Sequence, residues 1–289
     1  MRTDRIEHLP RLPQRERTGH KGTYGTVLGI GGSRGMAGAA ALAGKAALLT
    51  GCGLVRLAVP DPVLETAAGF YPELTTLPCP AGKKGRFALS ALEVLLEYAE
   101  QATAVFLGPG LGRSAGLDIL VPSFLRQNVK PLVVDADALN AVAVFGTEQM
   151  MKNIIFTPHP GEFARLIGSA PPPEEQLDER IAAAAEFAQR CRITLVLKGH
   201  RTIITDGKQT AVNSTGNPGM ATGGSGDVLT GIITSLLAQG FTAFEAAQLG
   251  VFLHGAAGDA AAERYTEPCV TAAVILECIP AAVRQLTNI

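Results

Sequence analysis

The feature that most constrains the fold is an alternation of short apolar runs with alanine- and leucine-rich segments of helical length. Two such segments, Gly38–Thr50 and Asp178–Gln189, are predicted helices. Buried strands are expected at the apolar runs Thr26–Ile30, Leu54–Val59, Ala104–Leu107, Leu132–Val134, Ile154–Phe156 and Thr194–Leu197. This pattern predicts an α/β fold with a central, mostly parallel sheet and helices on both faces.

The C-terminal third departs from this alternation. Thr202–Thr205 and Thr210–Asn213 flank Asp206 and Gly207, a pair typical of a hairpin turn, so an antiparallel pair is expected there. After Asp227 we expect three helical stretches that end near Leu286.

Length and composition indicate one large domain. The 289 residues are 47% hydrophobic, and no repeat or linker divides them, so we predict a single domain at 21–289 after an extension at 1–20. Residues 1–19 are basic and contain proline, and we expect them to be ordered only against a neighbour, if at all.

Charge and cysteine usage exclude several classes of function. A net charge of −1 gives no broad field for nucleic acid. No apolar run reaches about 18 residues, so no membrane span or leader is expected. The five cysteines form no Cys-x-x-Cys pair, which favours reduced structural thiols and a cytoplasmic protein.

A glycine-rich loop at Asn217–Asp227 has the character of a phosphate cradle. Its glycines lie at 219, 223, 224 and 226, and they let the backbone turn its N–H groups inward. The apolar run Val228–Leu237 predicts a helix directly behind the loop, whose positive N-terminal end favours an anion.

Asp227 at the edge of this cradle is the candidate general base. A carboxylate beside a phosphate is unfavourable unless it acts, for example by taking a proton from a hydroxyl that attacks phosphorus. The alternative is that Asp227 only caps the helix, a role that aspartate fills well.

The loops that follow the other predicted strands supply further candidates, because ligands of open α/β sheets bind beyond the carboxyl ends of the strands. Gly31–Ala39 consists mostly of small residues that allow a ligand, or merely a tight turn, against the backbone. Gly110, Gly112 and Ala115 match a dinucleotide fingerprint only weakly. Residues 135–137 read Asp-Ala-Asp and suggest a polar pair beside a phosphate or metal.

Two more strand ends carry charged or imidazole groups. His159 lies between two prolines in a stiff, exposed loop that suits ligand contact, whereas Glu162 fits either a ligand site or a helix cap. Lys198 directly follows a buried strand, which favours contact with phosphate over a solvated surface position.

Taken together, these motifs resemble the ADP-dependent NAD(P)H-hydrate dehydratases, a family with the ribokinase-like fold. The resemblance runs from about Lys21 to the C-terminus. The motifs that carry it occur in order at Lys21–Gly25, Gly31–Ser33, Gly108–Gly112, Asp135–Asn140, Thr157–Glu162, Lys198–Gly199 and Gly223–Asp227.

The resemblance implies repair of the (6S)-hydrate of NADH or NADPH. ADP would phosphorylate the substrate hydroxyl, AMP would be released, and phosphate would then leave to restore the reduced ring. The catalytic base would be Asp227. The substrate-binding residues would be Ala39, Gly110, Gly112, His159 and Asp227. The nucleotide-binding residues would be Lys198, Gly199, His200, Arg201, Thr202, Asn217, Gly224 and Gly226.

The resemblance also implies a cofactor and partners. Glu162 and Asp135 would help to organise Mg²⁺ through water, and the assembly would be a homotetramer. Many relatives are fused behind an epimerase domain, so we expect a separate NAD(P)H-hydrate epimerase to act in the same pathway. Two other hypotheses remain at this point: a kinase of a small hydroxymethyl heterocycle, such as a thiazole or pyrimidine vitamin precursor, and a non-catalytic nucleotide sensor.

Overall fold

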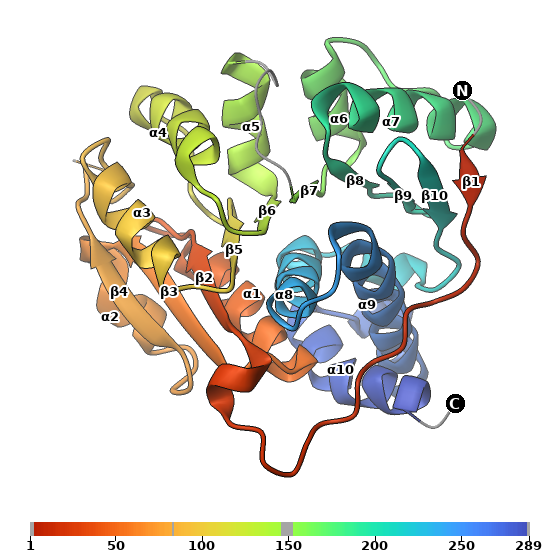
Figure 1. Cartoon of the computed structure of the whole chain (residues 1–289), viewed down its shortest axis with the longest axis horizontal. Coiled ribbons are helices and arrows are strands. Elements are labelled where there is room, and N and C mark those ends of the chain that lie inside the picture. Colours follow the sequence, from red (N-terminus) through yellow and green to blue (C-terminus); the bar gives the residue numbers. More distant parts are fainter. Residues whose placement is uncertain (1–2, 83, 146–152, 288–289) are drawn as a thin grey trace.

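The computed structural model describes residues 3–82, 84–145 and 153–287 and contains a ten-stranded sheet (Figure 1). The strand order is β1-β10-β9-β8-β7-β6-β5-β2-β3-β4, and β9 runs antiparallel to β8 and β10 while all other neighbours are parallel. The strands are β1 Asp4–Arg5, β2 Thr26–Ile30, β3 Leu54–Pro60, β4 Thr75–Cys79, β5 Ala104–Leu107, β6 Leu132–Val134, β7 Ile154–Phe156, β8 Thr194–Leu197, β9 Ile203–Thr205 and β10 Gln209–Val212.

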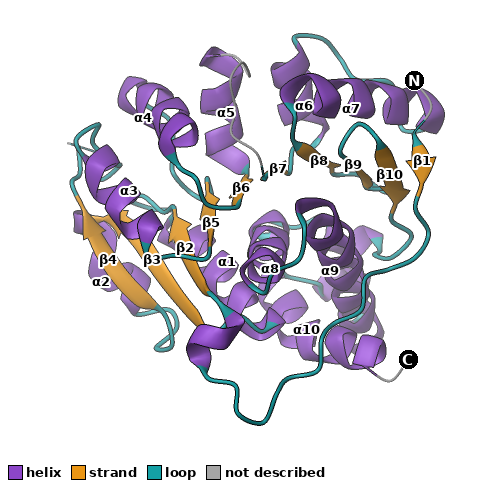
Figure 2. Cartoon of the chain, in the orientation of Figure 1, coloured by secondary structure: helices purple, strands orange, loops and turns teal. Residues whose placement is uncertain are grey.

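Helices cover both faces of this sheet (Figure 2). The α-helices are α1 Ala37–Thr50, α2 Leu64–Ala68, α3 Ala91–Glu100, α4 Ala115–Gln127, α5 Ala136–Phe145, α6 Pro160–Ile167, α7 Leu177–Cys191, α8 Ser225–Ala238, α9 Ala243–Tyr265 and α10 Ala272–Thr287. The short 3₁₀ helices are η1 Lys21–Tyr24, η2 Asp61–Val63, η3 Pro218–Met220 and η4 Glu267–Cys269. Among the described residues, no helix combines the length and apolar character needed to span a bilayer.

Strand side chains alternate between two apolar cores. In β6, Val133 packs into the core formed with α1, α2, α8, α9 and α10, whereas Leu132 and Val134 pack into the core formed with α3 to α7. Because both faces are buried, the central strands β5, β6 and β7 are apolar at every position, and their sequences appear as continuous runs. The predicted α/β architecture with a mostly parallel sheet is confirmed.

The predicted elements agree closely with the observed ones. All six expected strands form, the hairpin at Asp206 and Gly207 joins β9 to β10, and the three expected C-terminal helices are α8, α9 and α10. The prediction did not include β4, which lies at one edge and contains Pro78, or β1, which has only two polar residues. Edge strands lack the apolar signal of buried ones, which explains both omissions.

The expectation for the N-terminal segment is wrong in one respect, because residues of this same chain hold it. β1 pairs with β10, and Gln248 Nε2 donates a hydrogen bond to His8 O at 3.0 Å. Further along, the guanidinium of Arg15 lies 4.1 Å from the ring centroid of Tyr24. The segment therefore crosses from one sheet edge to the start of β2 without needing a neighbouring molecule.

The chain reverses its winding between β2 and β5, which are adjacent in the sheet. The helix after β2 (α1) lies on one face and the helix after β5 (α4) lies on the other. The carboxyl edge at such a switch point is where an open α/β sheet leaves room for a ligand. The loops after β2, β5, β6, β7 and β8 all meet at this edge.

Candidate active site

The N-terminus of α8 presents Asp227 on its first turn. Gly224 precedes the helix in a left-handed conformation, with φ of +88°, and a Cβ there would lie 2.8 Å from Leu42 Cδ1. Glycine is therefore required at this turn. Asp227 is the third helical residue and makes no side-chain hydrogen bond to the α8 backbone within the described part of the chain, so capping does not explain it.

A buried ion-pair cluster lies beside this helix end. Lys198 Nζ lies 3.0 Å from Asp135 Oδ1 and 3.9 Å from Glu162 Oε2. Thr230, one turn after Asp227, donates from Oγ1 to Asp135 Oδ2 at 2.7 Å. A Cβ on Gly226 would lie 3.4 Å from Lys198 Nζ, so the ammonium group lies against the backbone of the predicted cradle.

The cluster gives Asp227 the proton affinity of a base that works near neutral pH. Burial raises the pKa of Asp227 to about 7; the charges of Asp135, Asp137 and Glu162 add to the rise, and Lys198 opposes it. Burial also raises the pKa of Glu162. Burial alone would lower the pKa of Lys198, but Asp135 and Glu162 outweigh it and the pKa is raised. Lys198 therefore stays charged while Asp227 titrates near pH 7.

Glycines determine the conformation of the loops after β2 and β5. Gly108 has φ of +137°, and a Cβ there would lie 1.8 Å from the carbonyl oxygen of Asp135. Ser33 Oγ donates to Gly110 O at 2.8 Å and ties the two loops together. A Cβ on Gly110 would lie 3.1 Å from that of Ala39, so these two expected substrate-binding residues are neighbours.

The expected pair Asp135 and Asp137 is divided between two tasks. Asp135 pairs with Lys198, whereas Asp137 Oδ2 accepts a hydrogen bond from Gly112 N at 2.8 Å. Ala136 between them has φ of +50°, a left-handed conformation that separates the two carboxylates. Asp137 thus joins the β5 glycine loop to the surroundings of Asp227.

His159 combines exposure with a structural role. It is the N-cap of α6, where its Nδ1 accepts from Gly161 N at 3.0 Å and Glu162 N at 3.3 Å. Glu162 Oε2 in turn accepts from His159 N at 2.8 Å, which completes a capping box. The cap anticipated for Glu162 is thus observed. Burial, Lys198 and Arg165 lower the pKa of His159, whose side chain is still 51% exposed.

A cavity of about 770 Å³ opens between the loop after β8, the glycine loop before α8, and helix α9. It brings together most of the expected nucleotide-binding residues and also includes His159. Its apolar part comes mainly from η3, α8 and α9. The lining residues that matter here are Lys198, Gly199, His200, Thr202, Asn217, Gly226, Leu229, Val251 and Gly255.

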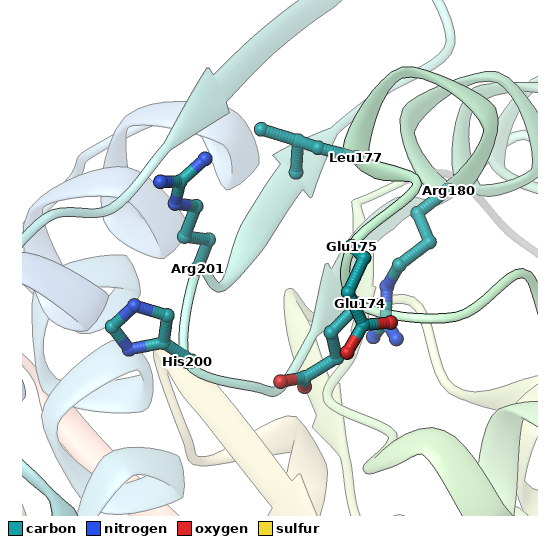
Figure 3. Close-up of a pocket in the computed structure, with 6 residues that line it drawn as sticks. All are labelled: Glu174, Glu175, Leu177, Arg180, His200 and Arg201. Carbon is teal, nitrogen blue, oxygen red and sulfur yellow. The ribbon is translucent and has the colours of Figure 1, made fainter.

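Two expected nucleotide-binding residues do not line this cavity. Gly224 shapes the backbone behind it, and Arg201 lines a smaller pocket of about 330 Å³. In that pocket His200 and Arg201 lie on one side, with glutamates and a buried arginine facing them (Figure 3). The facing residues are Glu174, Glu175 and Arg180.

The sequence analysis missed several polar groups of the site. His254 Nε2 lies 3.2 Å from Ser225 Oγ at the start of α8, and burial lowers the pKa of His254 to about 4, so it is neutral. Asp259 accepts hydrogen bonds from Gly216 N at 2.8 Å and from Asn217 Nδ2 at 3.0 Å. Thr230 had only an indirect signal: it follows Asp227 at helical spacing, which places both on one face of α8.

The donor set is unlike a protein-built metal cage. Within the described residues, no group of three or more His, Cys, Asp or Glu side chains could hold a metal ion. Both oxygens of Asp135 are occupied by Lys198 and Thr230, and Glu162 Oε2 is occupied by His159 N. Mg²⁺ usually keeps several waters and binds phosphates directly, so these residues fit a hydrated ion carried by a nucleotide.

Comparison with curated proteins identifies close relatives. A bifunctional NAD(P)H-hydrate repair enzyme of Moorella thermoacetica is 44% identical over 280 residues, which cover 95% of this chain and 52% of the relative. The chain thus spans about half the length of the bifunctional relatives. An ADP-dependent (S)-NAD(P)H-hydrate dehydratase of Neisseria meningitidis is 39% identical over 284 residues, covering 93% of this chain and 87% of the relative.

Solved structures support the same relationship. An ADP/ATP-dependent NAD(P)H-hydrate dehydratase of Bacillus subtilis, co-crystallised with ATP and Mg²⁺, matches with a TM-score of 0.79 and 30% identity over 96% of this chain and 95% of that one. A ribokinase-like superfamily protein of Enterococcus faecalis matches with a TM-score of 0.81 and 29% identity over 96% and 92%. The predicted ribokinase-like fold is confirmed.

The family described as NAD(P)H-hydrate dehydratase matches residues 27–281, a range that contains every catalytic and binding residue expected above. By this match and by its relatives, the chain belongs to the NAD(P)H-hydrate dehydratase family.

Proposed function

We propose that this chain catalyses the ADP-dependent dehydration of the (6S)-hydrate of NADH or NADPH, which restores the reduced cofactor and releases AMP and phosphate. The observation that carries the proposal is the Asp227 carboxylate, which has a pKa of about 7 and lies at the positive end of α8 beside Lys198. A base of this pKa can accept a proton at neutral pH without being permanently protonated.

The chemistry needs two steps. Asp227 takes the proton of the hydroxyl on the hydrated ring while the hydroxyl oxygen attacks the β-phosphorus of ADP and AMP departs. The C6–O bond of the phosphate ester then breaks and phosphate leaves as the ring nitrogen lone pair forms a C=N bond, and loss of the C5 proton restores the 5,6 double bond. Phosphate is a far better leaving group than hydroxide, which is why the hydroxyl is first esterified.

The ADP would occupy the 770 Å³ cavity. Its β-phosphate would accept hydrogen bonds from the N–H groups around Gly226, with Lys198 balancing the negative charge, because helix N-termini bind phosphates in this way. The adenine ring of ADP would pack against the apolar wall formed by Val251 and Gly255 on α9. His200, Thr202 and Asn217 line the intervening wall and suit the AMP portion.

The substrate side and the metal complete the proposal. Ala39, Gly110 and Gly112 would allow the hydrated nicotinamide to lie against the backbone, and His159 would contact it from the loop after β7. Mg²⁺ would neutralise charge on the phosphates, and Asp135 and Glu162 would help to hold its water ligands. A homotetrameric assembly, a separate epimerase and a cytoplasmic location remain predictions from the family resemblance and the composition.

The direct test is a reaction with purified protein, ADP, Mg²⁺ and the (6S)-hydrate of each cofactor. Recovery of the reduced-ring absorbance with one AMP per ring restored would support the proposal. Failure to restore the absorbance of either hydrate would contradict it. A stable phosphoester on a thiazole or pyrimidine alcohol would instead favour the kinase hypothesis. The nucleotide sensor would be favoured if Asp227→Ala left every measurable activity unchanged while nucleotide affinity persisted.

A further inference from the structure

Four cationic residues lie on three loops that meet at the glycine loop after β5, outside the nucleotide cavity. Arg34 follows β2, and Arg113 follows Gly112. Lys84 and Arg86 belong to a hairpin after β4 that is closed by a bridge between Ala81 and Phe87. We call Arg34, Lys84, Arg86 and Arg113 the arginine cluster. None of the four lines the 770 Å³ cavity.

Contacts between the three loops place these groups together. Arg34 N donates to Gly85 O at 3.1 Å, and a Cβ on Gly85 would lie 3.0 Å from Arg34 Cβ. A Cβ on Gly112 would lie 2.6 Å from Arg86 Nε, so the Arg86 side chain lies directly over that glycine. The hairpin therefore covers the β5 loop through Arg86 and holds Arg34 beside it.

In the part of the chain that the structure describes, the arginine cluster has no acidic partner of its own. Across the described ranges, no carboxylate lies within 4.0 Å of the charged nitrogens of Arg34, Lys84, Arg86 or Arg113. The acid known to contact this loop, Asp137, is hydrogen-bonded to Gly112 N. Cations that lie together without acidic partners repel one another and attract a ligand with several negative charges. Arginine in particular can bind two phosphate oxygens at once through its guanidinium group.

The position of this cluster relative to Asp227 narrows the choice of anion. Asp137 contacts Gly112 and is also near enough to raise the pKa of Asp227 by its charge. Arg86 over Gly112 is thus on the glycine-loop side of Asp227, away from the residues assigned to ADP. If the hydrated ring reacts at Asp227, the rest of the bound dinucleotide extends from the ring toward this side of the site. Its diphosphate and any 2′-phosphate would then lie near the arginine cluster.

We propose that Arg34 and Arg86, aided by Lys84 and Arg113, bind the phosphate groups of the hydrated dinucleotide. This inference rests on the proposed function and goes beyond it, because it assigns substrate recognition to cations that the motifs do not contain. These residues would act on substrate affinity and leave the phosphoryl transfer at Asp227 almost unchanged.

The test compares Arg34→Gln, Arg86→Gln and the double variant with the wild type, in steady-state kinetics with saturating ADP. We expect the KM for the hydrate to rise about tenfold for each single variant, with kcat within about twofold and the KM for ADP unchanged. Arg86→Lys should recover part of the loss because it keeps the charge. The matched control is Arg126→Gln, an exposed arginine on α4 whose guanidinium contacts Ser123.

Comparing the NADH hydrate with the NADPH hydrate shows which phosphate groups the arginine cluster binds. Equal losses with the NADH and NADPH hydrates would assign the cluster to the diphosphate, whereas a loss confined to the NADPH hydrate would assign it to the 2′-phosphate. Calorimetric titration with each hydrate in the absence of ADP should show the same weakening without turnover. Unchanged KM and unchanged hydrate affinity in the double variant would overturn the inference.

The outcome can be told apart from failure of the proposed function. Wild-type protein that restores neither hydrate disproves the function itself. Wild-type protein that restores both, together with arginine variants that bind and react like the control, disproves only the role of the arginine cluster. Circular dichroism melting of each variant checks that the hairpin change has not unfolded the domain.

Discussion

On one side of Asp227, charged and polar side chains hold one another in place through ion pairs and hydrogen bonds. On the other side, glycines determine the backbone conformation of two loops. The charged side consists of Asp135, Glu162, Lys198 and Thr230, linked by hydrogen bonds and ion pairs of 2.7–3.9 Å. The glycine side consists of the loops Gly31–Ala39 and Gly108–Gly112, where a Cβ would collide with neighbouring backbone at several points.

This difference indicates how each side responds to change. On the charged side, removing a group changes the charges around Asp227 and therefore its pKa. On the glycine side, adding a methyl group displaces backbone and weakens the fold without altering charge. Substitutions can therefore separate the two sides, since one set should change pH profiles and the other should change melting temperatures.

The largest expected effect is that of Asp227→Asn. An amide cannot accept the hydroxyl proton, so kcat should fall by at least about 100-fold, the usual contribution of a general base. In the wild type, kcat should fall as the pH drops below about 7, because the base is then protonated. Steady-state rates between pH 5 and 9 measure both effects, and a variant with a tenth or more of normal activity would exclude Asp227 as the base.

The same substitution, Asp227→Asn, should lower activity but raise the stability of the folded protein above neutral pH. Folding raises the Asp227 pKa from 3.8 to about 7, so the folded state binds the proton more tightly than the unfolded state. The wild type should lose stability, by up to a few kcal/mol, as the pH rises from about 4 to about 7. Asp227→Asn should lack this loss and melt several degrees higher than the wild type at pH 8.

Lys198→Met should be the next most severe change. It leaves Asp135, which is 1% exposed, without its cation, and breaking a buried pair in this way costs about 3 kcal/mol. Loss of the cation should also raise the pH below which kcat falls, which is the acid limb of the pH–rate profile, because Lys198 lowers the pKa of Asp227. Urea unfolding and a pH–rate profile measure the two effects; an unmoved limb would contradict the coupling.

Gly108→Ala tests the glycine side. The added Cβ would meet the Asp135 carbonyl at 1.8 Å, so the β5 loop must shift, and we expect a loss of about 2–3 kcal/mol in unfolding free energy. Gly240→Ala is the matched control, because its φ is +95° but nothing lies within 4 Å of the added atom. The control should lose only about 1 kcal/mol, from backbone strain alone. Equal losses in both variants would show that the contact is unimportant.

The smallest expected effect is that of Thr230→Val. Loss of the hydrogen bond to Asp135 Oδ2 should cost about 1 kcal/mol and leave that carboxylate less firmly oriented toward Lys198. The acid limb should therefore move slightly, while Thr234→Val should leave it unchanged. Thr234 is a suitable control since it lies one turn further along α8 and, within the described residues, its hydroxyl bonds only to the carbonyl of Thr230.

Much of the fold was accessible from the sequence because burial on both faces makes central strands apolar throughout. The runs at Ala104–Leu107 and Ile154–Phe156 were predicted to the residue for this reason. The edge strands β1 and β4 lack that signal, since one is two polar residues long and the other contains Pro78. Order in the N-terminal segment depends on contacts with β10 and α9, which no local pattern reveals.

The candidate site was predicted unevenly for a related reason. Motifs at strand ends identified Lys198 and His159, because parallel strands bring their carboxyl ends to one edge, and the glycine-rich loop before a predicted helix identified Asp227. Contacts between distant segments were missed: Thr230 meets a carboxylate 95 residues away, and His254 meets a hydroxyl 29 residues away. Arg86 was missed because it belongs to a hairpin without apolar periodicity, and its position over Gly112 appears only once the loops are folded.

The two edges of the sheet have a consequence for how the protein behaves at high concentration. An open sheet edge offers unpaired N–H and C=O groups to which a second molecule can add a strand. Here β1 occupies part of the β10 edge, and Pro78 removes a donor from β4 at the opposite edge. Both ends of the sheet thus discourage strand-by-strand growth, and deletion of Asp4 and Arg5 should expose β10 to self-association and fibre formation.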